Sequence, residues 1–213
     1  MLISHSRKFI FIHVYKVAGT SIRKVLNKYS DHSAAYENPL KLAGARLGLI
    51  PRIYSKDFKG HITAKELKAK LPSDIFENYY KFAFVRNPWD WQVSLYEYAM
   101  QNTKHREHEM TKAFRSFEEY IDWRVDGNFE LQCDFLSTET GEIIVDRIGK
   151  LENIENDFSE ICQRIGITQP KLSKANSTKR KHYSKYYKES SIEKVAKTFR
   201  KDIEDFNYSF EHG

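Results

Sequence analysis

Hydrophobic positions along the chain alternate between short continuous runs and helical periods. Residues 8–14 and 81–85 are compact apolar runs, and each leads through a turn into a pattern of helical period. A third run, "EIIVDRIGKLE", precedes a helix that should end near Gly166. Because strands alternate with helices, the pattern predicts an α/β fold with a mainly parallel central sheet flanked by helices. No repeat, linker or low-complexity tract interrupts residues 1–213, so we expect one domain.

Capping residues mark where several helices should begin. Thr63 and Glu66 have the spacing of a capping box, so a helix is expected just after His61. Asn87 can cap a helix whose first position is Pro88. Further helices are expected over residues 20–29, after Pro72, after Ser116, and from about Ser191, the last with Ile192, Val195, Ala196, Phe199, Ile203 and Phe206 on one face.

The remaining segments carry weaker signals. Residues 1–7 read as a lead-in to the first strand, residues 31–58 as short helix and loop, and residues 101–113 as an exposed loop or helix end. Among the histidines, His13 on the first strand should be packed and structural. Solvent exposure is expected for His105, His108 and His182.

Composition narrows the classes of partner and compartment. Aromatic residues are 14% and hydrophobic residues 40% of the chain, which argues against general disorder, and the net charge of +6 favours an anionic partner. The two cysteines, Cys133 and Cys162, have no metal-ligand spacing and form no disulfide framework, which leaves one bridge or two free thiols. Of these we expect free thiols in a reducing compartment. Without a visible targeting segment or membrane span, the chain is expected to be a cytoplasmic enzyme with no stable membrane insertion.

The stretch "HVYKVAGTS" at residues 13–21 is a candidate phosphate site. A strand that turns into a helix presents backbone N–H groups at the helix N-terminus, where the helix dipole also favours an anion. Gly19 allows close backbone approach, Thr20 and Ser21 add hydroxyl donors, and Lys16 can place its ammonium along the same anion. The order differs from the Walker pattern of nucleotide hydrolases, which disfavours an NTPase. An ordinary strand–turn–helix is the alternative.

A second stretch, "FAFVRNPWDWQVSLY", repeats the strand–turn–helix arrangement. Arg86 follows the strand, and Ser94 lies eight residues later, about two turns into the helix. An arginine fork and a hydroxyl can grip a second phosphate group together. The alternatives are an ion pair between Arg86 and Asp90, and a surface hydroxyl at Ser94.

The two stretches together resemble the signature segments of sulfotransferases that use 3′-phosphoadenosine 5′-phosphosulfate (PAPS). The first is similar to the 5′-phosphosulfate loop of that family, and the second to its 3′-phosphate segment with Arg-Asn-Pro and a downstream serine. The likeness is strongest to the carbohydrate branch that includes heparan sulfate 2-O-sulfotransferases and bacterial relatives. "GHITA", "LQCDFLS", "IGKLENIENDF" and the tail from "HYSKYY" to "DIEDFNYSF" extend it over most of the chain.

The resemblance implies roles for particular residues. Lys16 would stabilise the leaving 5′-phosphate, Arg86 and Ser94 would hold the 3′-phosphate, and no metal is required. Two departures stand out, because Tyr15 replaces a frequent proline and Val17-Ala18 replaces a more usual Thr-Gly. We therefore expect the backbone at Ala18 to avoid positive φ. The donor-binding set implied by the resemblance is Lys16, Ala18, Gly19, Thr20, Ser21, Arg86, Ser94, Asn176, Ser177, Lys179 and Arg180.

The last four of these residues belong to the basic run at 171–188, which has seven Lys/Arg residues and no acid. In related sulfotransferases a basic loop late in the chain closes over the donor phosphates. The alternatives are a solvated charge run, or nucleic-acid binding, for which no recognition motif is present. We favour donor binding, with an anionic acceptor as a second use, and expect no nucleic-acid partner.

His61 in "KGHITA" is the candidate base. It immediately precedes a capped helix, and imidazole suits proton transfer near neutral pH. The sequence thus predicts a PAPS-dependent sulfotransferase that acts on a hydroxyl, with a carbohydrate as the expected acceptor, and releases adenosine 3′,5′-bisphosphate (PAP). The rival hypotheses are a kinase-like phosphotransferase and a basic glycan- or nucleic-acid-binding module with a degenerate donor site. A cap or surface histidine is the alternative for His61, and the oligomeric state is not encoded in any pattern we can interpret.

Overall fold

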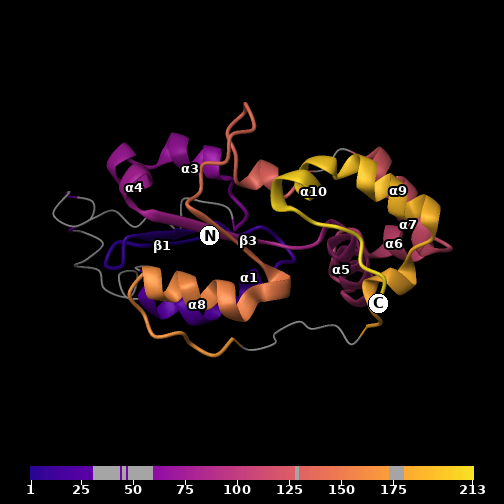
Figure 1. Ribbon diagram of the computed structural model, residues 1–213, viewed down its shortest axis with the longest axis horizontal. Coiled ribbons are helices and arrows are strands. Elements are labelled where there is room, and N and C mark those ends of the chain that lie inside the picture. Colours follow the sequence, from indigo (N-terminus) through magenta and orange to yellow (C-terminus); the bar gives the residue numbers. More distant parts are fainter. Residues whose placement is uncertain (31–43, 45–46, 48–59, 128–129, 173–179) are drawn as a thin grey trace. The chain divides into compact units, whose positions relative to one another are not determined.

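The computed structural model describes residues 1–30, 44, 47, 60–127, 130–172 and 180–213 (Figure 1). The chain divides into two compact units. Unit 1 comprises residues 1–85 and 134–175, and unit 2 comprises residues 86–133 and 176–213. Each unit is assembled from two stretches of chain that are distant in sequence, and the expected grouping of both units into one domain stays a prediction.

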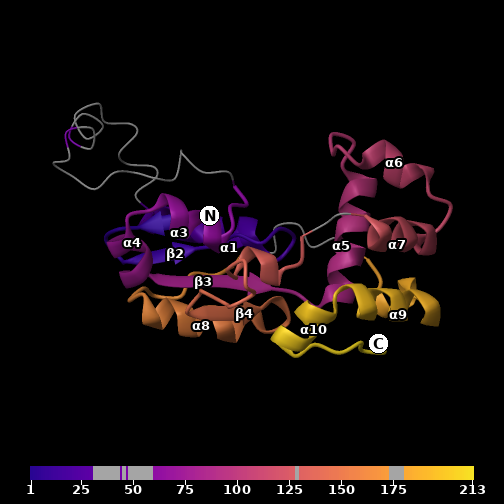
Figure 2. The same cartoon turned by 90° about the horizontal axis from the view of Figure 1, so that it is seen from above.

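Unit 1 contains a four-stranded sheet in the order β1-β2-β3-β4 within the described residues (Figure 2). Parallel pairing joins β2 to β3 and β3 to β4, which confirms the mainly parallel sheet of an α/β fold. The first two strands pair antiparallel. The strands are β1 (Leu2–Ser4), β2 (Phe9–Phe11), β3 (Tyr80–Val85) and β4 (Arg147–Lys150).

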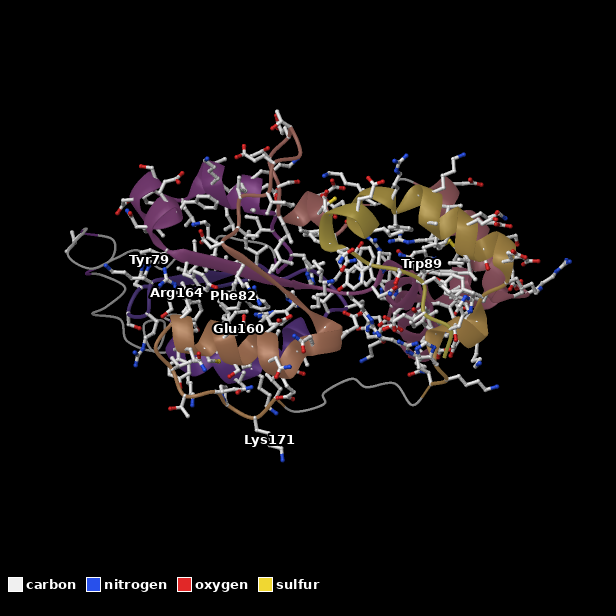
Figure 3. The ribbon with its side chains drawn as sticks, viewed as in Figure 1. Tyr79, Phe82, Trp89, Glu160, Arg164 and Lys171 are labelled. Carbon is white, nitrogen blue, oxygen red and sulfur yellow. The ribbon has the colours of Figure 1, made fainter. Side chains whose placement is uncertain are left out.

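Both faces of this sheet are covered by helices, as Figure 1 shows. The helices α3 and α4 lie on one face, and α1 and α8 lie on the other. Burial on two faces explains why β2 is wholly apolar and why β3 is a continuous apolar run after Lys81, instead of an alternating pattern. Phe82, labelled in Figure 3, is fully buried, and its ring lies 5.3 Å from that of Phe11 on the neighbouring strand. The helical elements of this unit are α1 (Gly19–Leu26), η1 (Asn27–Tyr29), α3 (Ala64–Lys70), α4 (Ser73–Asn78), η4 (Leu151–Asn153) and α8 (Ile154–Arg164).

Unit 2 is helical in its described residues. Its long helix α5 packs with α6, α7 and α9. The side chain of Asn87 caps α5 by accepting from the Trp89 N–H, and Pro88 occupies the first position, as the sequence predicts. The helical elements are α5 (Pro88–Gln101), α6 (His108–Ala113), α7 (Phe117–Asp126), η5 (Tyr183–Tyr186), α9 (Glu189–Thr198) and α10 (Arg200–Phe206), with η3 (Cys133–Phe135) at the boundary between the units.

Three predictions about elements were wrong. Residues 1–7 are more than a lead-in, because they contain the buried strand β1. The final helix is two helices, α9 and α10, which meet at the fully buried Phe199. The segment 101–113 contains α6, whose His108 is 5% exposed and donates from Nδ1 to the Ala99 carbonyl at 2.8 Å. That histidine is therefore packed against α5 instead of facing solvent.

Candidate active site

The turn before α1 combines two left-handed residues that are not glycine. Lys16 has φ 62° and Ala18 has φ 60°. The expectation that Ala18 avoids positive φ was therefore wrong. A left-handed alanine costs about 1–2 kcal/mol, which the surrounding contacts must offset. Strain of this kind is found where a turn must present its backbone in one particular shape.

Gly19 is required for a different reason from the one its turn position suggests. Its φ is not among the positive values, so conformational freedom does not select it. A Cβ atom built on Gly19 would lie 1.8 Å from both Cδ2 and Nε2 of His13. The His13 imidazole therefore packs against the glycine backbone, and only a hydrogen atom fits between them.

The N-terminus of α1 has the features of an anion site. Ala18 provides no side-chain cap, and the first turn contains no acidic residue. Thr20 is exposed, whereas Ser21 is buried at 3% exposure. The backbone N–H groups of the first turn have no intrahelical partners, so this helix end suits a phosphate.

His61 is held by a contact that selects its tautomer. Its Nδ1 lies 2.9 Å from the backbone carbonyl oxygen of His13 and, because a carbonyl only accepts, Nδ1 must carry the proton. In the neutral ring the lone pair then belongs to Nε2. The ring also lies 4.5 Å from the His13 ring and 6.0 Å, edge-on, from the Tyr15 ring. An exposed imidazole with a fixed tautomer is what general-base chemistry requires.

His13 is buried, as predicted, but it does more than fill the core. Burial, together with the nearby chain amino group, His61 and Arg23, lowers the pKa of His13 from 6.5 to about 2. Within the described part of the chain, its Nδ1 has no hydrogen-bond partner. The neutral His13 ring is thus in contact with Gly19 on the phosphate turn and with the ring of His61. Sequence reasoning identified the burial of His13 and missed this bridging position.

In unit 2, Arg86 is paired with Asp90. The Asp90 Oδ2 accepts from Nε of Arg86 at 2.7 Å and lies 2.6 Å from its Nη2. The two side chains are 12% and 17% exposed. The ion pair that stood as the alternative for Arg86 is therefore present, and it leaves the phosphate-binding hypothesis for this arginine untested.

The same carboxylate contacts a second arginine. Arg180 donates from Nη2 to Oδ1 of Asp90, the oxygen that Arg86 does not use in its pair. The basic run and the Arg-Asn-Pro segment therefore converge on one side chain, Asp90. The other three candidates in that run, Asn176, Ser177 and Lys179, lie outside the described residues.

Gln132 fixes the backbone of Arg86 and was missed by sequence reasoning. Its side-chain oxygen accepts from the Arg86 N–H at 2.9 Å, and its side-chain nitrogen donates to the Arg86 carbonyl at 2.7 Å. The backbone N–H groups of Gln132 and Cys133 in turn donate to the fully buried Asp202. A polar residue inside "LQCDFLS" was the available signal, but its partner is 46 residues away.

Ser94 is 8% exposed, so it is not a surface hydroxyl. Cys133 and Cys162 are both free and buried, and burial raises the pKa of the Cys162 thiol to about 11. Among the residues that the structure describes, no cluster of three His, Cys, Asp or Glu side chains could hold a metal ion. The described helices include none with the length and apolar character to cross a membrane.

Comparisons with known proteins identify the family of the chain and a solved structure with a similar fold. An uncharacterized protein of Archaeoglobus fulgidus is 30% identical over 120 residues, which are 56% of this chain and 94% of that protein. A crystal structure of mouse sulfotransferase SULT7A1 complexed with PAP has a similar fold, with a TM-score of 0.54, 14% identity, and coverage of 95% of this chain and 87% of that one. The family model described as "Sulfotransferase family" matches residues 1–209. The chain therefore belongs to the sulfotransferase family.

Proposed function

We propose that this sulfotransferase uses PAPS as its donor and transfers the sulfuryl group to a hydroxyl, with a carbohydrate as the acceptor. Family membership supports sulfuryl transfer, and the choice of a carbohydrate rests on the resemblance of the sequence to that branch. The observation that carries the mechanism is the contact of one neutral ring, His13, with both Gly19 on the phosphate turn and His61. The candidate base and the candidate phosphate site are thereby separated by a single imidazole.

The residues present fit the donor at both of its phosphate groups. The uncapped N-terminus of α1, with Lys16 preceding it, suits the 5′-phosphate. The pair of Arg86 and Arg180 provides two guanidinium groups for the 3′-phosphate, and Ser94 adds a hydroxyl on α5. PAPS would supply an activated sulfuryl group whose leaving group is the 5′-phosphate.

Each side chain then has one task in the transfer. Nε2 of His61 accepts the acceptor's hydroxyl proton while the hydroxyl oxygen forms its bond to sulfur. The bond from sulfur to the bridging oxygen breaks, and the electron pair stays on the 5′-phosphate. The Lys16 ammonium and the N–H groups of α1 stabilise the charge that develops there. The proton, the sulfuryl group and the leaving group are all accounted for without a metal.

A ligand comparison tests the donor. PAP should raise the melting temperature strongly, because ligand at one hundred times its dissociation constant adds about 2.7 kcal/mol of stability. AMP, which lacks the 3′-phosphate, should give a much smaller shift at the same concentration. Equal shifts from the two ligands would contradict the 3′-phosphate site, and a larger shift from ATP than from PAP would favour the kinase-like alternative.

Ser94→Ala localises that result. The variant should weaken the binding of PAP and leave the binding of AMP unchanged. The melting-temperature shifts from the two ligands should therefore become more alike. Thr111→Val is a matched control, because Thr111 is a fully buried hydroxyl on another helix of the same unit. A screen of hydroxyl acceptors with labelled PAPS then tests the carbohydrate, and transfer only to non-carbohydrate acceptors would contradict that part of the proposal.

A further inference from the structure

Asp90 occupies an unusual place for an acid in a protein that binds anions. It lies in the first turn of α5, four residues after Arg86, and each of its oxygens is used by a different arginine. Arg86 and Arg180 are 94 positions apart in sequence, so only the fold brings them to one carboxylate. An acid that merely balanced one arginine would not need the second contact.

Other contacts fix the backbone at Arg86 and the chain that follows Arg180. Gln132 fixes the backbone of Arg86 on its N–H and on its carbonyl side. The chain that follows Arg180 is attached to α5, because Tyr186 donates to Glu97 and Tyr187 donates to the Trp89 carbonyl, each at 2.8 Å. With the backbones fixed in this way, the remaining freedom lies in the two long side chains, and Asp90 removes it.

We propose that Asp90 is a positioning residue for the donor's 3′-phosphate, because its carboxylate assembles Arg86 and Arg180 into one anion-binding pair before the donor arrives. This inference rests on the proposed function. Asp90 holds the two arginines in place before the donor binds, and the arginines make the contacts to the phosphate.

The charge of the cluster allows it to attract a phosphate in addition to Asp90. Asp90 contacts two nitrogen atoms of Arg86 and one of Arg180. Two arginines and one aspartate leave a net charge of +1, so the cluster still attracts a phosphate. Without the carboxylate, two guanidinium groups at 12% exposure would repel each other, and the pair would separate in the free enzyme.

Asp90→Asn keeps the size of the side chain and removes its charge. We expect it to weaken PAP binding at least tenfold in calorimetric titration, while AMP binding stays within twofold because AMP has no 3′-phosphate. A purely structural role for Asp90 would weaken both ligands equally. Asp122→Asn is the matched control, since Asp122 is another aspartate of unit 2, on α7, whose ion pair is with Lys194 instead of an arginine of the cluster. That control should change neither affinity.

A double-variant cycle with Arg180→Gln tests whether Asp90 acts through Arg180. In the Arg180→Gln background, Asp90→Asn should cost less than threefold in PAP affinity. The double variant is also useful if Asp90→Asn alone fails to fold. Arg180→Gln removes one of the two guanidinium groups that lose their counter-ion when Asp90 is replaced.

Three results would overturn the inference. They are an unchanged or tighter affinity of Asp90→Asn for PAP, an equal loss for AMP, and a full tenfold effect in the Arg180→Gln background. If the wild-type protein itself binds PAP and AMP equally, the 3′-phosphate site of the proposed function fails, and the inference fails with it. That outcome is recognised in the wild type before any variant is compared.

Discussion

The two candidate phosphate sites are built by opposite means. In unit 1 the turn before α1 is shaped by backbone, with left-handed Lys16 and Ala18 and a glycine that admits a neutral ring. In unit 2 the site is shaped by side chains, with two arginines on one carboxylate. At the first site a neutral imidazole, His13, packs against the turn, whereas the second site is a network of charges.

The two sites are sensitive to different kinds of substitution. A site made of backbone fails when an atom is added, because packing around it is already complete. A site made of ion pairs fails when a charge is removed, because the partner is left without compensation. Variants at either site therefore test the contrast between them.

His61→Ala should lower turnover about 10²- to 10⁴-fold, the usual contribution of a general base. PAP affinity should be nearly unchanged, because the proposal gives His61 a role toward the acceptor hydroxyl and none toward a donor phosphate. Lys16→Ala is the informative counterpart, since it should lower turnover and also weaken PAP. The measurement is single-turnover rate together with PAP affinity for both variants.

The pH profile adds a second readout for His61. The base works as the neutral imidazole, so the wild-type rate should fall on the acid side as the ring is protonated, and this limb should be absent in His61→Ala. Near-wild-type turnover in the variant would show that another group, such as Glu66, is the base. Loss of PAP binding in a folded variant would move His61 into the donor site.

Gly19→Ala should lower the free energy of unfolding by about 3 kcal/mol, because overpacking of this severity displaces a buried ring. The added Cβ would lie 1.8 Å from the His13 imidazole. Gly60→Ala is the matched control, since no atom of the described residues lies within 4 Å of a Cβ built there. Urea unfolding measures both variants. A change of less than 1 kcal/mol at position 19 would show that the ring has room to move, and the backbone-built description would be wrong.

The depressed pKa of His13 predicts acid sensitivity in unit 1. The unfolded chain binds a proton on this ring below a pH of about 6.5, whereas the folded chain does so only near its pKa of about 2. Stability is therefore present above pH 6.5 and is lost as the pH falls, by at most about 1.4 kcal/mol per pH unit. Between pH 6.5 and 4.5 the wild type should lose about 2 kcal/mol more than His13→Leu.

The control for this titration is His212→Gln, because His212 is exposed and near the chain end. Its unfolding free energy should follow the wild type at each pH. If His13→Leu and the wild type lose stability in parallel, then His13 takes up a proton in the folded protein, and the neutral ring described at the first site is disproved.

Much of the fold was predictable because its signals are local. The strands β2 and β3 lie within the apolar runs of the sequence, and the capping box of Thr63 and Glu66 forms as its spacing indicates. The strand β1 was missed because three residues carry too little pattern without their antiparallel partner. His108 was predicted to be exposed because its neighbours in the sequence are polar. Its buried hydrogen bond to the Ala99 carbonyl of α5 leaves no local pattern in the sequence.

The candidate site was predictable only in its residue types. Lys16, Gly19 and Arg86 are recognisable because turns and strand ends present such residues to anions. Their geometry was not predictable. Gly19 is required by the ring of His13, six positions earlier, and the second partner of Asp90 is Arg180, 90 positions later. Interactions at such separations depend on the complete fold and leave no periodic trace in the sequence.

The amide of Gln132 has a consequence for the chemical ageing of the protein. It binds both the backbone N–H and the backbone carbonyl of Arg86, a task that needs a donor and an acceptor on the same side chain. Hydrolysis of that amide would replace the nitrogen with oxygen and leave a carboxylate facing the Arg86 carbonyl, in a place with no exposure to solvent. An exchange of one heavy atom, at a residue that need touch neither donor nor acceptor, would thereby release the strand end from which Arg86 extends.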